Sequence, residues 1–268
     1  GPMKTSVVIC IDYNSCDETR TYISTLLEMN SYIHVILVCN SGKEKFSKSF
    51  LSKNRLYVYD FGENLGYMNA ACMGFKEYLK KNTIPDWVVL SNTDITFASK
   101  DFFTVLGNDN RLNCIIAPEI ISADGVYQNP FLCRRPTKIK MYLLRFIYSF
   151  TFLFKCYSLL SRLKTSLICK NKKIDDVRLI YAAHGSFIII SGDCFKSKFT
   201  LEHPAFLYGE ELILAERSRL NNIATIFDPK YKIIHHEHVS TGKLASRFKA
   251  ECLKNSISCV IKDYYKND

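Results

Sequence analysis

The stretch TSVVICIDYN, residues 5–14, indicates the fold class of this chain. It is a run of apolar and β-branched residues that ends in polar positions, which is the pattern of a buried strand followed by a loop. The next segment, residues 17–30, begins with Asp17 and then repeats apolar residues at helical spacing. A strand without polar alternation that is followed at once by a helix is typical of a parallel sheet covered on both faces.

The same alternation of strand and helix continues to residue 97. Apolar strand-like runs lie at residues 34–42, 55–64 and 86–97, and a helix-like segment follows a glycine turn at residues 66–81. We therefore predict an α/β fold, an α/β/α sandwich around a mostly parallel central sheet. Ligands of such sheets bind beyond the carboxyl ends of the strands. The polar residues expected there are Asp12, Tyr13, Asn14, Asn40, Ser41, Asn64, Asn92 and Asp94.

The second half of the chain has a different pattern. We predict strands at residues 114–121 and 181–195, a helix at residues 212–222, strands within residues 223–240 and a last helix from residue 242. No internal repeat and no low-complexity linker separates the two halves. Gly1 and Pro2 precede Met3 and look like a cloning remnant, so we leave them out.

Composition excludes several protein classes. The chain has 268 residues, of which 47% are hydrophobic and 23% charged, which is ordinary for a globular protein with a sizeable core. Its eleven cysteines are odd in number and include no CxxC pair. This pattern favours reduced cysteines in a cytosolic protein, and it disfavours a disulfide scaffold or a zinc site built on cysteine.

The net charge of +10 comes from one segment, residues 131–174. It contains no acid and eleven bases, which are Arg134, Arg135, Lys138, Lys140, Arg145, Lys155, Arg162, Lys164, Lys170, Lys172 and Lys173. Its longest uncharged run, residues 146–154, is too short to span a bilayer, which takes about twenty residues. The segment suits a helix on an anionic membrane surface, with its bases facing the leaflet. The alternative is a core helix of an insertion, and the few polar residues between the bases disfavour nucleic acid.

Five short motifs follow one another along the chain. They are DYN (12–14), ENLGYMNAACMG (63–74), SNTD (91–94), FLYGEEL with the later ER (206–217), and Pro229 followed six residues later by His235. In this order and spacing they resemble the family 2 glycosyltransferases, which are inverting enzymes of the GT-A (Rossmann-like) fold. The resemblance is strongest to the branch that includes bacterial rhamnosyltransferase-like proteins, and it covers about residues 5–240.

The resemblance implies a divalent metal site, for Mg²⁺ or Mn²⁺, at Asp94 and His235. Such an ion neutralises the charge that develops on a leaving diphosphate, and it prefers oxygen ligands. Asn92 stands where many relatives have a first aspartate. An Asx turn at the end of a strand is the alternative for Asn92 and Asp94. A polar turn or a zinc site is the alternative for His235 with its neighbours His236 and His238.

Glu210 and Glu211 are adjacent acids between apolar residues. The resemblance implies that Glu211 is the base that takes the proton from the acceptor hydroxyl, and that Glu210 orients the base or the acceptor. We expect the helix N-terminus to keep the base ionised at neutral pH. A helix-capping acid with a solvated partner is the alternative. Arg217 is expected to hold the acids or the diphosphate, and Ile213 replaces a common family aspartate.

The resemblance also implies the donor site. The nucleotide is expected to bind at Asp12, Tyr13, Asn14, Asn40, Asn64 and Gly66, with Asn92, Gly185 and Arg217 nearer the sugar and diphosphate. Gly66 permits close approach of the backbone. Cys39 stands where relatives often carry an aspartate that reads the base, so the prediction leaves a uridine (UDP) and a thymidine (dTDP) donor open.

Together these predictions describe a single GT-A domain, residues 3–268. It would consist of a nucleotide-sugar half (3–112), an acceptor half (113–241) with a helical insertion (131–177), and a C-terminal helix (242–268). The acceptor is expected to be a lipid-linked glycan of an O-antigen or capsule, and the location the cytoplasmic face of the cell membrane, without nucleic acid as a partner. A nucleotidyltransferase is a rival, although no Lys-bearing Gly-rich loop follows the first strand. A noncatalytic membrane-bound sugar-nucleotide-binding protein is another.

Overall fold

The computed structural model describes residues 4–167, 173–237 and 243–267. The strands of this described part are β1 (Ser6–Asp12), β2 (Ile33–Cys39), β3 (Leu56–Tyr59), β4 (Trp87–Ser91), β5 (Ile95–Phe97), β6 (Cys114–Ser122), β7 (Arg178–Leu179), β8 (Phe187–Ser191) and β9 (Ala224–His235). The helices are α1 (Cys16–Met29), α2 (Lys48–Leu51), α3 (Met68–Leu79), α4 (Phe102–Gly107), α5 (Lys138–Tyr148), α6 (Thr151–Leu167), α7 (Glu210–Leu220) and α8 (Lys243–Tyr264).

All the strands belong to one sheet, in which the order β3-β2-β1-β4-β8-β6-β9-β5 is extended by β7 on β9. Strands β3, β2, β1 and β4 are mutually parallel, as predicted for the first half. The second half is mixed, because β8 lies antiparallel to both β4 and β6, and β5 lies antiparallel to β9. In the same half, β6 and β9 are parallel neighbours, although the chain passes through β8 between them.

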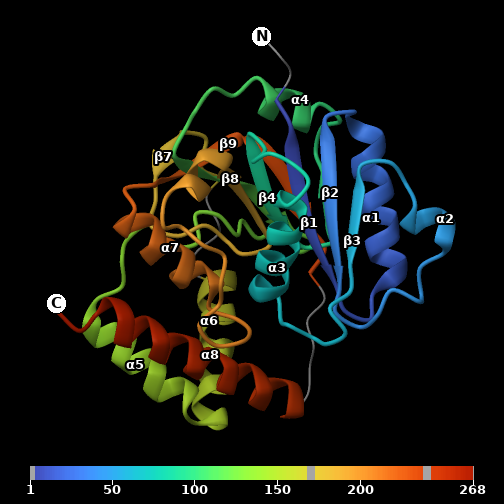
Figure 1. Ribbon diagram of the computed structural model, residues 1–268. Helices are drawn as coiled ribbons and strands as arrows, with labels where there is room; N and C mark the ends of the chain where they lie inside the picture. The colour runs from blue at the N-terminus through green and yellow to red at the C-terminus, as the bar shows by residue number, and fades with distance from the viewer. Residues whose placement is uncertain (1–3, 168–172, 238–242, 268) are drawn as a thin grey trace.

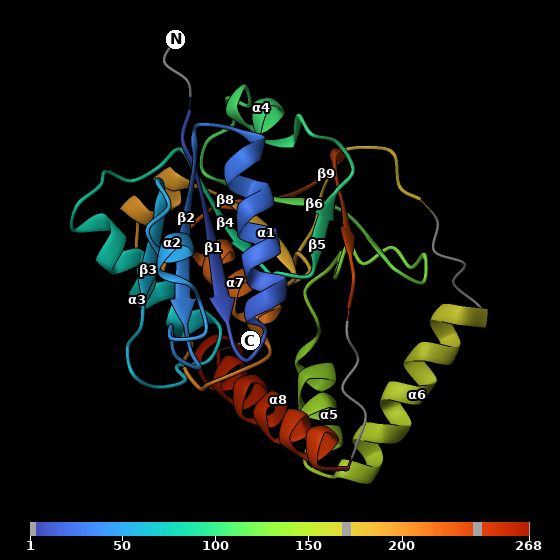
Figure 2. The ribbon, with the colours of Figure 1, turned by 90° about the vertical axis from the view of Figure 1, so that its right-hand side faces the viewer.

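Helices cover both faces of this sheet (Figures 1 and 2). On one face, α1, α2 and α4 contribute side chains such as Ile23, Phe50 and Phe102 to a core that includes Val8 and Leu37 of the strands. On the other face, α3 and α7 pack against alternate residues of the same strands, and α8 and α5 lie next to α7 across one end of the sheet (Figure 1). The predicted α/β/α sandwich is thus confirmed. Apolar side chains on both faces also explain why these strands lack polar alternation.

The predicted insertion forms a helical hairpin, α5 followed by α6. Helix α5 lies alongside α8, and α6 projects away from the sheet (Figure 2). Thr137 begins α5, since its side-chain oxygen accepts a hydrogen bond from the Lys140 N–H at 3.2 Å. The predicted C-terminal helix is α8, which contacts α5, α6 and α7.

Candidate active site

The predicted nucleotide-binding residues meet at the carboxyl ends of β1 and β2. The backbone N–H of Asn40 donates to the carbonyl of Asp12 at 2.9 Å, and the N–H of Asn14 donates to the Ser41 hydroxyl at 2.8 Å. The Asn40 side chain donates to the carbonyl of Gly66 at 2.8 Å, which attaches the turn before α3 to the end of β2. Residues from three separate motifs therefore line one edge of the sheet.

Asp12, Asn40 and Asn64 have structural partners. The carboxylate of Asp12 is buried and accepts a 2.6 Å hydrogen bond from the Thr19 hydroxyl, so it fixes the turn between β1 and α1. The side chain of Asn40 is also buried. Tyr13 is exposed, and Asn64 accepts a hydrogen bond from the N–H of Gly66 at 3.0 Å. Binding of a nucleotide by this group remains a prediction.

Gly66 connects this edge to the segment with the two glutamates. Its φ is +80°, and a Cβ atom at this position would lie 2.5 Å from the carbonyl oxygen of Phe206. Only glycine fits so close to another backbone in this left-handed conformation. The turn of the ENLGYM motif and the FLYGEE motif are thus in direct contact, although about 140 residues separate them in the sequence.

Asp94 and His235, the predicted metal ligands, are adjacent. The Nε2 atom of His235 lies 3.3 Å from Oδ2 of Asp94, and the Asn92 amide nitrogen lies 3.5 Å from the same Nε2 atom. The other ring nitrogen of His235 lies 2.8 Å from Oε1 of Gln128. The Gln128 amide nitrogen donates to Glu237, so Oε1 accepts the Nδ1–H of the imidazole. This arrangement directs Nε2 toward the carboxylate.

The donor set fits a divalent cation. An imidazole lone pair opposite a carboxylate is unfavourable unless a proton or a cation lies between them. The second carboxylate oxygen of Asp94, Oδ1, is buried and has no hydrogen-bond partner among the described residues. A hydrogen bond that fixes the far nitrogen of a ligating histidine is also typical of metal sites. Asp94 and His235 would hold the ion, with Asn92 beside them.

His236 has a partner away from Asp94 and His235. His236 is exposed, and its Nε2 atom is paired with the Thr96 hydroxyl at 2.9 Å. Burial and the nearby His235 lower the pKa of His184 to about 4. His238 lies outside the described residues. Within the described part of the chain, no group of three or more His, Cys, Asp or Glu side chains could hold a metal. The zinc alternative includes His238 and is therefore not tested.

Glu210 and Glu211 begin α7 directly after a left-handed turn. Tyr208 and Gly209 have φ values of +64° and +76°, and the two glutamates that follow this turn are half-buried. The Tyr208 N–H donates to Glu210 Oε1 at 3.0 Å. The Gly185 N–H donates to Glu211 Oε2 at 2.8 Å. Each acid thus accepts a backbone hydrogen bond from a segment outside α7.

Burial opposes the expected effect of the helix N-terminus, which was to keep this pair ionised. Burial, followed by the charge of Glu211, raises the pKa of Glu210 to about 7. Burial also raises the pKa of Glu211, although the Gly185 N–H and, more weakly, the charge of Lys249 on α8 oppose this shift. Desolvation of a carboxylate outweighs a helix dipole, which contributes at most about 2 kcal/mol.

Gly185 joins the glutamates to the metal ligands. A Cβ atom on Gly185 would lie 2.6 Å from Oε2 of Glu211, so the carboxylate occupies the space that a side chain would need. The next residue, Ser186, accepts a hydrogen bond from the backbone N–H of Asn92 at 2.8 Å. A single backbone segment therefore contacts Glu211 on one side and the end of β4 on the other. Contact of Gly185 with a donor sugar remains a prediction.

Arg217 does not contact the two acids. Its guanidinium donates to the carbonyl of Thr200 at 2.8 Å, so it supports the loop before the FLYGEE motif. The acid that does bind arginine is Glu216, which is fully buried and lies 2.7 Å from Arg135. Ile213 belongs to the hydrophobic core. The helical period explains these differences, because residues 213 and 216 share the inward face of α7.

Two contributions to the site were not predicted from the sequence. The hydroxyl of Tyr67 is buried without a hydrogen-bond partner among the described residues. Burial, followed by charges that include Glu210 and Asp94, raises its pKa, so this hydroxyl lies within the field of both acid groups. Helix α8 also reaches the site, since the Ser256 hydroxyl donates to the carbonyl of Tyr208 at 2.8 Å. The ENLGYM motif was the only signal for Tyr67.

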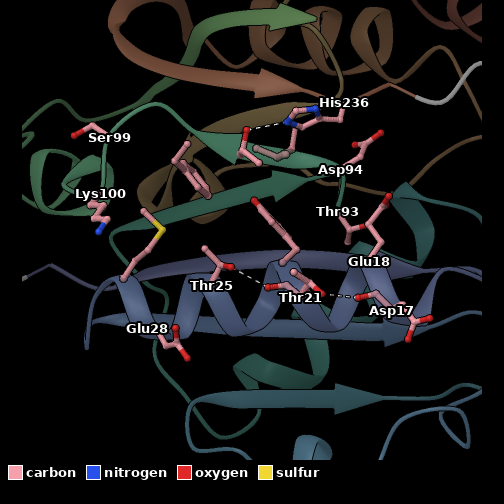
Figure 3. A pocket seen from close by; sticks show the side chains of 15 residues that line it. Asp17, Glu18, Thr21, Thr25, Glu28, Thr93, Asp94, Ser99, Lys100 and His236 are labelled. Carbon is pink, nitrogen blue, oxygen red and sulfur yellow. Dashed lines mark hydrogen bonds between the residues drawn. The ribbon is translucent and has the colours of Figure 1, made fainter. Parts of the chain in front are cut away.

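A cavity of about 840 Å³ opens beside Asp94 (Figure 3). It lies between α1 and the segment around β5, with acids of α1 such as Glu18 on one wall and His236 on the other. Among the predicted site residues only Asp94 lines it. Helix α1 covers the face of the sheet opposite to α7, so this cavity approaches Asp94 from the side away from the glutamates.

Comparison with known proteins supports the fold. No protein-family model matches the chain. The low-salt glycan biosynthesis hexosyltransferase Agl10 of Haloferax volcanii is 23% identical over 245 residues, which cover 90% of this chain and 70% of that relative.

Two solved structures are similar over nearly the whole chain. GalNAc-T7, crystallised with UDP, GalNAc and Mn²⁺, matches with a TM-score of 0.56 and 12% identity over 98% of this chain, which spans 49% of that protein's length. The mannosyltransferase PcManGT of Pyrobaculum calidifontis, in complex with GDP-Man and Mn²⁺, matches with a TM-score of 0.50 and 9% identity over 100% of this chain and 76% of its own. At these identities the likeness establishes the GT-A glycosyltransferase fold.

Proposed function

We propose that this chain is a glycosyltransferase that moves a sugar from a nucleotide-diphosphate sugar to a hydroxyl group of a glycan. The observation that carries the proposal is the junction at Gly185 and Ser186, which connects the carboxylate of Glu211 with the end of β4 beside Asp94 and His235. One backbone segment thereby links the proposed proton acceptor to the strand end that precedes the proposed cation ligand Asp94. The similarity to Agl10, which is named a hexosyltransferase, supports the same reaction class.

Glu211 is assigned as the base. A raised carboxyl pKa suits general-base catalysis, because proton transfer is most effective when the pKa of the base lies near the working pH. The Gly185 N–H orients the carboxylate, and Glu210, held by the Tyr208 N–H, faces the acceptor or the base. A divalent ion bound by Asp94 and His235 would supply positive charge to the leaving diphosphate.

We infer inversion at the anomeric carbon, because one base that activates the acceptor hydroxyl is sufficient for a single displacement. The order of the five motifs supports assignment to family 2 and its rhamnosyltransferase-like branch. As the acceptor we propose a lipid-linked oligosaccharide in the synthesis of a bacterial surface polysaccharide, such as an O-antigen or capsule, at the cytoplasmic face of the membrane. Agl10 is named for glycan biosynthesis, which is compatible with such an acceptor.

Within this proposal the chain is one domain, 3–268. Residues 3–112 bind the donor, and residues 113–241, with the insertion 131–177, bind the acceptor. The family resemblance leaves UDP and dTDP donors open. We add GDP to the candidate donors because PcManGT was solved with GDP-Man.

The test is a thermal-unfolding screen of the whole chain with UDP, dTDP and GDP, each with and without Mn²⁺, followed by assay of nucleotide release from the matching sugar donors. A nucleotide at a hundred-fold excess over its Kd stabilises a protein by about 2.7 kcal/mol, which raises Tm by roughly 5 to 10 °C. We expect one nucleotide to do so only with Mn²⁺, and its sugar donor to be turned over. Absence of any nucleotide-dependent shift and of any release would contradict the proposal.

The same screen separates the rival functions. A noncatalytic binder would show the shift in Tm without nucleotide release from any donor. A nucleotidyltransferase would consume a nucleoside triphosphate and a sugar phosphate and release pyrophosphate. Release of a nucleoside diphosphate from a sugar donor is the outcome specific to a glycosyltransferase.

A further inference from the structure

The α5–α6 hairpin exposes an unusual number of large apolar side chains. Of the eighteen large hydrophobic residues that are exposed in the described chain, nine lie between residues 139 and 160. We name this surface the hairpin face, and it consists of Ile139, Tyr142, Leu143, Phe146, Phe150, Phe152, Tyr157, Leu159 and Leu160. Exposed apolar residues gathered on one helical hairpin in this way mark an interaction site.

Helix α5 has two apolar sides. Met141 and Leu144 are buried toward the body of the protein, where α5 packs on α8. Ile139, Leu143 and Phe146 recur at intervals of four and three residues and form a second stripe, which faces solvent. A helix that is apolar on opposite sides is normally covered on both. The described chain covers only one side of α5.

The hairpin face carries positive charge and no negative charge. Lys140 and Lys155 are exposed, and Arg145 lies over the Tyr142 ring at 4.8 Å. Residues 131–161 contain no aspartate or glutamate. Apolar side chains between bases are typical of helices that lie in the headgroup region of an anionic bilayer. A second copy is a poor partner, because two such faces would bring like charges together.

The hairpin does not have the form of a simple membrane span. In the described chain no single helix is long and apolar enough to cross a bilayer, whereas Lys138–Tyr148 and Thr151–Ser161 meet the criteria only together, with a bend of 119° between them. Helix α5 ends at this bend, where the hydroxyl of Ser149 donates to the carbonyl of Arg145 at 2.7 Å. A bent pair with one solvent-facing apolar side can lie along a membrane surface.

The hairpin is also firmly attached to the helix that begins with the two glutamates. Arg135, directly before α5, pairs with Glu216 of α7 at 2.7 Å and donates to the carbonyl of Tyr264 at 2.9 Å. The Tyr265 hydroxyl donates to the carbonyl of Pro136 at 2.8 Å. Arg135 is therefore a structural anchor, and the expectation that it faces a leaflet is wrong.

We propose that the hairpin face docks on an anionic lipid bilayer, with its Phe and Leu side chains inserted among the headgroups and Lys140 and Lys155 at the phosphates. Docking of the hairpin face does not depend on the proposed transfer reaction. Its role in catalysis, which is to present a lipid-linked acceptor to Glu211 from the bilayer surface, rests on the proposed function.

The test measures binding of the whole chain to vesicles of phosphatidylcholine alone and of phosphatidylcholine mixed with phosphatidylglycerol, without any donor. The key variant is Phe152→Ser/Leu159→Ser, which changes side chains that are 75% and 59% exposed. Its matched control is Leu112→Ser/Leu220→Ser, at 71% and 59% exposure elsewhere on the protein. Thermal unfolding verifies that all variants fold, as expected for such exposed positions.

We expect the wild type to prefer the anionic vesicles, and Phe152→Ser/Leu159→Ser to lower this binding at least roughly ten-fold, since each inserted side chain contributes that much or more. The control pair should bind like the wild type. Lys140→Ser/Lys155→Ser should weaken binding to anionic vesicles by roughly thirty-fold, on the basis of roughly five-fold per base. It should leave binding to phosphatidylcholine alone unchanged, and added salt should weaken the wild type only in part.

Three results would overturn the proposal. The first is a wild type that binds neither vesicle. The second is equal loss of binding in the key variant and its control. The third is a wild type that is dimeric by light scattering and becomes monomeric in Phe152→Ser/Leu159→Ser without vesicle binding, which would assign the face to a second copy. None of these measurements uses a nucleotide sugar, so failure here and failure of the proposed transfer reaction are distinguishable.

Discussion

Replacement of Gly185 by alanine is the most direct perturbation of the proposed base. The backbone of Gly185 is not left-handed, so alanine is tolerated there by the main chain itself. The new Cβ atom would lie 2.6 Å from Glu211 Oε2, whereas ordinary van der Waals contact begins at 3.4 Å. The carboxylate must therefore retreat by about 0.8 Å. That movement stretches the 2.8 Å hydrogen bond from the Gly185 N–H to about 3.6 Å, which is no longer a hydrogen bond.

The size of the effect follows from the bond that is lost. A hydrogen bond to a charged group contributes about 1.5 to 3 kcal/mol. If the bond orients Glu211 in the transition state, kcat should fall by roughly 10- to 150-fold. Because the N–H favours the ionised carboxylate, its loss raises the pKa of Glu211 further. The acid limb of the pH–rate profile should therefore move to higher pH in Gly185→Ala.

The assay is the initial rate of nucleotide release with the donor found in the screen, measured as a function of pH. Gly107→Ala is the control, since its Cβ atom would meet only the carbonyl oxygen of Lys4 at 3.9 Å. In a Glu211→Ala background the close contact between the Cβ atom and the carboxylate is absent, so adding Gly185→Ala should cause no further loss of kcat. A loss that persists in that background as a higher KM would indicate that Gly185 contacts the donor sugar instead. If kcat of Gly185→Ala lies within about two-fold of the control, a difference of about 0.4 kcal/mol, the reasoning is refuted.

The other predictions concern the same site. Glu211→Gln should lower transfer by roughly 10²-fold or more, the usual scale of base catalysis, and Glu210→Gln by less; the reverse order in kcat would exchange their roles. Glu210→Gln should also raise Tm at about pH 8 but not at about pH 5. A carboxyl whose folded pKa is raised to about 7 lowers the stability of the protein as pH rises through that value. Equal shifts in Tm at the two pH values would contradict this. Asp94→Asn should abolish the Mn²⁺-dependent shift in Tm, whereas His236→Ala should retain it, and full turnover in EDTA would exclude the metal. Tyr67→Phe removes a hydroxyl without a described partner, so Tm should not fall while nucleotide release falls roughly 5- to 150-fold, the range for one hydrogen bond; a lower Tm with unchanged release would assign it to the fold.

The sequence was sufficient to predict the strands that are buried on both faces. TSVVICIDYN predicts β1 because every side chain from Val7 to Cys10 faces a hydrophobic layer, which leaves no polar alternation. The mixed half of the sheet was harder to predict from the sequence. Strand β8 pairs with β4 and β6 in antiparallel orientation through partners about 70 to 100 residues away, and such pairing depends on the three-dimensional path of the connections.

The candidate site also has one part that could be predicted from the sequence and one that could not. The resemblance predicted that Asp94 and His235 belong together, and the structure brings them to 3.3 Å. The contact between Gly185 and Glu211 could not be predicted, because it depends on a missing Cβ atom and a turn in left-handed conformation before α7. Neither feature leaves a periodic pattern in the sequence.

Helix α7 makes the physical reason explicit, because it contains three glutamates with different properties. Glu216 is fully buried, and burial alone would raise its pKa, yet hydrogen bonds from Arg135, Arg219 and the Tyr181 hydroxyl lower it. Glu210 and Glu211 have backbone donors but no arginine, so desolvation dominates and their pKa values rise. A buried carboxylate with cationic partners is accounted for by those partners, whereas a pair of acids with raised pKa values and no such partners is a candidate for a functional role. The acids at the start of α7 therefore require a functional explanation. Glu216 does not, because its ion pair with Arg135 joins α7 to the start of the helical hairpin.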